Sequence, residues 1–62
     1  MIEPSDNTQE LMARAVAFLV RHNRRSEADE LRVAYLALNY QNVRTLRRET
    51  LKLVKKYVEV GA

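Results

Sequence analysis

The chain's one proline and one glycine, Pro4 and Gly61, lie near its two ends. Residues 5–60 therefore contain neither of the two residue types that most often interrupt a helix. Apolar residues recur in this stretch at steps of three and four, which is the spacing of one helix face. The sequence predicts an all-α chain.

Polar residues divide the chain into three predicted helices, over residues 8–22, 27–40 and 43–60, after an N-terminal tail of residues 1–7. The first two form a helical hairpin and the third is longer and basic. A length of 62 residues indicates one domain. The absence of cysteine excludes disulfides and thiolate metal sites as supports for so small a fold.

Asparagine and serine residues mark the predicted ends of the helices. Asn7 is expected to cap the first helix, with Asp6 as the alternative, and Asn42 to cap the third. Ser26, followed three residues later by an acid, matches the start of the second. Asn23 is expected to end the first helix in a left-handed conformation.

The boundary between the second and third helices is marked by a change of phase. The apolar stripe of the third helix consists of Val43, Leu46, Thr50, Leu53, Tyr57 and Val60. Extended backwards, the same stripe meets mostly polar residues. A turn near residues 39–42 is the simplest cause, and one continuous helix over residues 27–60 is the alternative.

The first two predicted helices are apolar around most of their circumference, whereas a helix in a small monomer needs an apolar arc of a little over 100°. A domain of this size is also marginal by itself, because it buries only ~60% of its extended-chain surface. We therefore expect a homodimeric helical bundle. The residues expected at its interface are Met12, Val16, Leu19, Val20, Val33, Leu36 and Tyr40.

The positive charge is concentrated on the third helix. Residues 43–60 contain six bases and two acids, whereas residues 1–42 have a net charge of −1. The basic residues expected to bind an acidic protein surface or a nucleic acid are Arg44, Arg48, Lys52, Lys55 and Lys56, with a second cluster at Arg24 and Arg25.

Arg47 falls inside the apolar arc of the third helix. One interpretation is that its head group reaches water past its neighbours. The other is an ion pair with a carboxylate of another helix or subunit, for which Glu27 and Glu30 are candidates.

Catalysis has few candidate residues, because the chain has one histidine and no cysteine, and one glycine cannot form a phosphate-binding loop. We expect no enzyme activity, no cofactor and no metal. The acidic start does not resemble a secretory signal, and the longest apolar-rich run, Leu11–Val20, is too short to span a bilayer. We expect a cytoplasmic protein that does not insert into membranes.

These expectations together predict a small helical protein-interaction module, an adaptor, inhibitor or regulator, that forms homo-oligomers through the apolar faces of the first two helices. The alternative is a nucleic-acid-binding regulator whose basic third helix contacts the phosphate backbone. The amino-acid sequence indicates only the part of nucleic-acid recognition that does not depend on the nucleotide sequence.

Overall fold

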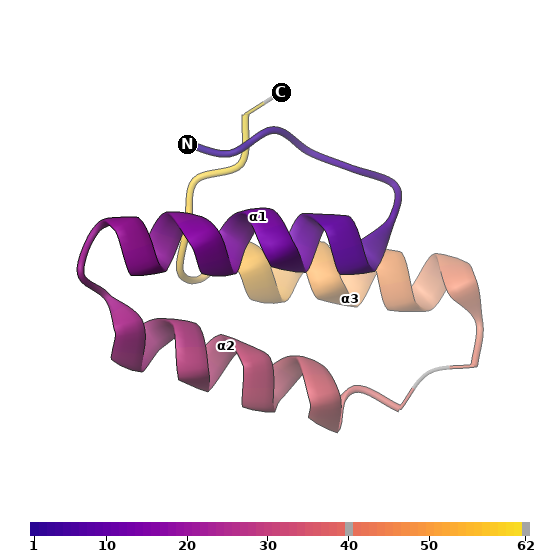
Figure 1. Ribbon diagram of the computed structural model, residues 1–62. Helices are drawn as coiled ribbons and strands as arrows, with labels where there is room; N and C mark the ends of the chain where they lie inside the picture. Colours follow the sequence, from indigo (N-terminus) through magenta and orange to yellow (C-terminus); the bar gives the residue numbers. More distant parts are fainter. Residues whose placement is uncertain (40, 62) are drawn as a thin grey trace.

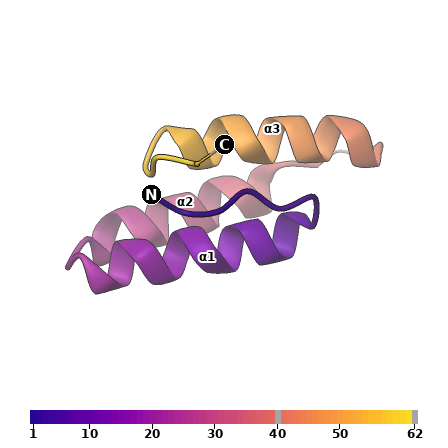
Figure 2. The same cartoon turned by 90° about the horizontal axis from the view of Figure 1, so that it is seen from above.

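The computed structural model describes residues 1–39 and 41–61, which form three α-helices (Figure 1). α1 spans Thr8–Arg21, α2 spans Arg25–Ala37 and α3 spans Val43–Lys55. The predicted all-α class with three helices is confirmed. α1 and α3 run in the same direction and α2 runs opposite to both (Figures 1 and 2).

Two asparagine side chains start helices as predicted. The Asn7 side-chain oxygen accepts hydrogen bonds from the backbone N–H groups of Gln9 at 2.9 Å and Glu10 at 3.2 Å, so Asn7, not Asp6, is the cap of α1. Asn42 accepts from the amides two and three residues later, at 2.9 and 3.3 Å. Both caps satisfy amides that have no partner within the helix.

The turn between α1 and α2 is a left-handed helix terminator. Asn23 has a φ of 59°, a conformation that asparagine tolerates better than most residues. The N–H of Arg24 donates to the Leu19 carbonyl at 2.7 Å, and that of Asn23 donates to the Val20 carbonyl at 3.1 Å. This pair of bonds is a Schellman motif, so the predicted role of Asn23 is confirmed.

The predicted start of α2 was wrong. The helix begins at Arg25, and its N-cap residue is Arg24, which makes no side-chain capping bond. Ser26 therefore lies inside the first turn. The reason is that the chain leaves the Asn23 turn already in position for a helix, and the Ala28 N–H bonds the Arg24 carbonyl at 3.1 Å.

A turn separates α2 from α3. α2 ends at Ala37, earlier than expected, and Leu38 is extended, with φ −69° and ψ 120°. The continuous helix is thereby excluded, and the turn predicted from the change of phase is confirmed.

α3 ends at Lys55, five residues before the predicted residue 60. Beyond it the Val58 N–H still bonds the Val54 carbonyl at 2.9 Å, and Val58 is 3% exposed. The Tyr57 carbonyl accepts a 2.9 Å bond from the Arg24 side chain instead of continuing a helix. Tertiary contacts thus stop a segment whose own sequence contains no helix breaker before Gly61.

The N-terminal tail is joined to the C-terminal segment of the chain. Ile2 is 8% exposed and forms a parallel bridge with Val60. The Ile2 N–H donates to the Glu59 carbonyl at 2.9 Å, and the Ile2 carbonyl accepts from the Gly61 N–H at 2.8 Å. Arg14 holds the same segment by donating to two of its carbonyls, at 3.2 Å each. The two ends of the chain consequently lie together (Figure 1).

The core combines side chains from all three helices and from the two terminal segments. Its buried residues are Ile2, Leu11, Met12, Ala15, Leu19, Ala28, Leu31, Val54 and Val58, with Thr50 as the buried polar residue. The Thr50 hydroxyl has no hydrogen-bond partner within the described part of the chain. An unpaired buried hydroxyl opposes folding.

We predict that Thr50→Val raises the free energy of unfolding by about 1 kcal/mol, because it removes an unpaired polar group while keeping the branched shape. Urea denaturation followed by circular dichroism measures this. The matched control is Thr8→Val, which removes a hydroxyl bonded to that of Tyr35 at 3.1 Å and should destabilise the protein. A loss of stability in Thr50→Val would contradict the prediction.

Candidate interaction surfaces

Large apolar side chains of α1 and α2 remain exposed on the single chain. Leu36 is 80% exposed and Val33 is 69% exposed, both on α2, and Val20 of α1 is 42% exposed. Val16 of α1 is half-buried. Four of the residues expected at an interface are thus not fully covered by the chain's own fold.

A groove of about 630 Å³ lies between α1 and α2. Its lining residues are Gln9, Met12, Ala13, Val16, Ala17, Arg32, Tyr35 and Leu36. Ala13 and Ala17 are exposed and small, so a second backbone can approach α1 closely there. Leu36 lines the α2 side of the groove and is 80% exposed, so an uncovered apolar side chain lies beside the two alanines.

Two of the remaining residues of the expected interface belong to the core. Leu19 is fully buried and Met12 is 6% exposed, both in the core of the single chain. Leu19 therefore belongs to the core of the single chain, whereas Met12 belongs to the core and also lines the groove. Tyr40 lies outside the described residues.

The basic residues of α3 and its end are exposed as a group. They are Arg44, Arg48, Lys52, Lys55 and Lys56. Glu49 lies among them, 3.9 Å from Arg48 and 3.8 Å from Lys52. One carboxylate partly offsets two of the five bases, so the surface remains strongly positive.

Arg24 and Arg25 have different surroundings. Arg24 is half-buried, pairs with Glu27 and bonds the Tyr57 carbonyl at 2.9 Å, whereas Arg25 is exposed. Arg24 therefore ties α2 to the segment after α3, and Arg25 is the more exposed member of the predicted cluster.

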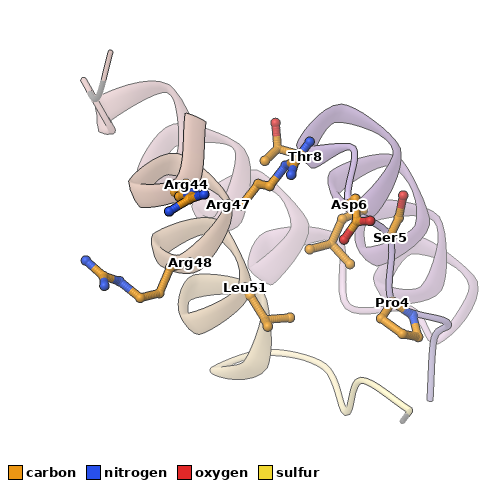
Figure 3. Close-up of a pocket in the computed structure, with 9 residues that line it drawn as sticks. Pro4, Ser5, Asp6, Thr8, Arg44, Arg47, Arg48 and Leu51 are labelled. Atoms are coloured by element: carbon orange, nitrogen blue, oxygen red, sulfur yellow. The ribbon is translucent and has the colours of Figure 1, made fainter. Parts of the chain in front are cut away.

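Arg47 is exposed and lines a cavity of about 540 Å³ beside the segment that precedes α1 (Figure 3). Within the described residues it makes no ion pair with Glu27 or Glu30, so its head group reaches water. Sequence reasoning missed this cavity, because its other wall is a segment predicted to be a tail. The sequence feature that pointed to it is the group of three arginines in the first turns of α3, Arg44, Arg47 and Arg48.

Comparison with models of protein families, with curated proteins and with solved structures finds no match to this chain. The residues themselves are therefore the basis for assigning these surfaces. Among the described residues, no helix combines the length and the apolar character that crossing a membrane requires.

We predict that Arg24→Ala lowers the free energy of unfolding by about 1 kcal/mol, because charge-assisted hydrogen bonds of this kind contribute modestly when partly exposed. Arg25→Ala, at an exposed neighbour, is the control and should change stability by less than about 0.5 kcal/mol. Denaturation curves of both variants provide the measurement. Equal effects would show that Arg24 has no special structural role.

Proposed function

We propose that this protein is a small non-enzymatic helical interaction module, an adaptor, inhibitor or regulator, that acts as a homodimer through the outer faces of α1 and α2. The observation that carries the proposal is the exposure of Leu36, at 80%, beside the α1–α2 groove. Soluble monomers rarely leave an extended apolar patch uncovered.

A second copy of the chain is the occupant that this face favours. In a twofold dimer each copy contributes the same patch, so the patch must complement itself. An exposed leucine in a groove that also contains Ala13 and Ala17 supports this arrangement, in which the leucine of each copy enters the groove of the other.

An interface of ordinary size would cover only part of the surface of the chain. A stable interface buries about 800 Å² on each partner. The accessible surface of the described chain is 4659 Å², so a dimer of this size would cover a modest part of it and leave α3 free for an acidic partner.

We predict that Leu36→Glu weakens dimerisation about 100-fold, because both copies lose an anchor and place a charge in an apolar groove. The monomer should remain folded, since Leu36 makes little contact within its own chain. Sedimentation equilibrium at micromolar concentration measures the mass, and circular dichroism checks the fold.

Val43→Glu is the matched control, because Val43 is 58% exposed but lies at the start of α3, away from the groove. It should dimerise like the unmodified chain. A monomeric unmodified protein, or equal loss in both variants, would refute the proposed dimer.

The alternative function is nucleic-acid binding by the basic face of α3. It is supported by five exposed bases spread over a helix of 13 residues and the residue that follows it, a length of roughly 20 Å. Several such bases can reach phosphates of one backbone. No motif for base-edge recognition is found among the described residues, so we expect the affinity to be independent of nucleotide sequence.

For this alternative we predict that duplex DNA or RNA binds with an affinity that falls steeply between two salt concentrations, and that Lys52→Glu with Lys55→Glu abolishes binding. Arg21→Glu, an exposed reversal on α1, should cost much less than Lys52→Glu alone. Fluorescence anisotropy provides the affinities. The absence of binding at low salt would exclude the alternative.

A further inference from the structure

The cavity beside Arg47 has two chemically different walls (Figure 3). The apolar wall consists of Pro4, Leu11 and Leu51, and the basic wall consists of Arg44, Arg47 and Arg48. The remaining lining residues are Ser5, Asp6 and Thr8. Its volume of about 540 Å³ falls in the range of small-molecule sites, which is roughly 300–1,000 Å³.

The arginines differ in where they point. Arg47 extends from α3 toward Thr8 at the start of α1, whereas Arg48 extends away from α1 (Figure 3). Arg44 lies one turn before them on the same helix, three residues from Arg47, and residues at that spacing are neighbours on a helix face. Arg47 therefore reaches across the cavity, and Arg44, which also lines it, is a neighbour of Arg47 on α3.

The positive charge at the cavity is poorly balanced. Arg48 has Glu49 at 3.9 Å, but no ion pair involves Arg44 or Arg47 within the described ranges. The first turn of α3 contains no acidic residue. Asp6 is the one carboxylate among the lining residues, which include three arginines, and of these Arg48 has Glu49 nearby.

We propose that this cavity binds a small phosphate monoester that carries an apolar group. The phosphate lies against Arg44 and Arg47, because a guanidinium group presents paired N–H donors that match two phosphate oxygens. The apolar group lies against Pro4, Leu11 and Leu51, where it leaves water. The proposal does not depend on the homodimer, since the α1–α2 groove and the cavity share no lining residue.

Phosphate is favoured over a carboxylate by its charge. A monoester carries up to two negative charges at neutral pH and three acceptor oxygens, so it can engage two guanidinium groups at once. A carboxylate carries one charge and balances the charge of one guanidinium group. The apolar wall adds a second requirement, which inorganic phosphate does not meet.

The test is a titration of the ¹⁵N-labelled full chain with phenyl phosphate, followed by NMR. We expect saturable shifts of the Thr8, Leu11 and Leu51 amides. Inorganic phosphate should bind at least several-fold more weakly, and benzyl alcohol, which has a ring but no charge, should produce no saturable shift at these amides.

Arg44→Gln with Arg47→Gln should weaken phenyl phosphate binding at least tenfold, while Arg21→Gln, at an exposed arginine far along α1, should not change it. Asp6→Asn should strengthen binding several-fold, because it removes the opposing charge. All of these side chains are exposed, so the variants should fold. The gain of affinity expected for Asp6→Asn cannot arise from unfolding.

Three results would overturn the proposal. They are the absence of saturable binding, equal affinity in the double variant and the unmodified chain, and shifts confined to amides near Lys52 and Lys55. The last result would indicate that phosphate interacts with the open basic face and not with the cavity.

Discussion

The rest of the structure depends on the burial of one stripe of α1 against both other helices. Leu11, Ala15 and Leu19 follow one another at intervals of four, and none is more than 2% exposed. The alanine at the centre allows close packing, and the leucines on either side belong to the buried core. Burial of apolar side chains is the main favourable term in folding. A chain of 62 residues can bury few others.

This arrangement also determines what remains outside. Since α1 contributes one stripe to the core, Ala13, Val16 and Val20 on its other side are left partly or fully exposed. α2 likewise buries Ala28 and Leu31 and leaves its outer residues uncovered. α3 is more strongly amphipathic, so its outer surface is charged. The apolar surface and the basic surface therefore belong to different helices and can act separately.

Much of the fold could be predicted because its signals are local. Asn7, Asn23 and Asn42 act on amides and carbonyls within a few residues of themselves, and a single sequence contains that information. The end of α3 could not be predicted in this way. It depends on Arg24 reaching the Tyr57 carbonyl, 33 residues away, and on pairing between the two ends of the chain.

The candidate surfaces were predictable in kind but not in every residue. Periodicity identifies a wide apolar arc on α1, but it cannot tell which part of that arc faces the core, and so Leu19 and Val20 were expected to share one role. Net charge identifies the basic helix, but not that Arg24 is used for structure. The cavity at Arg47 required knowledge of where residues 4–6 lie, which only the packed chain supplies.

The bridge between Ile2 and Val60 has a consequence for the order in which the molecule assembles. These residues are 58 positions apart, and closing a loop of that length in an unfolded chain costs roughly 3–4 kcal/mol of chain entropy. Two backbone hydrogen bonds and one buried isoleucine cannot offset much more than that. Once the helices have packed, the ends are already neighbours and most of this cost has been met. We therefore expect the termini to pair after the three helices have packed.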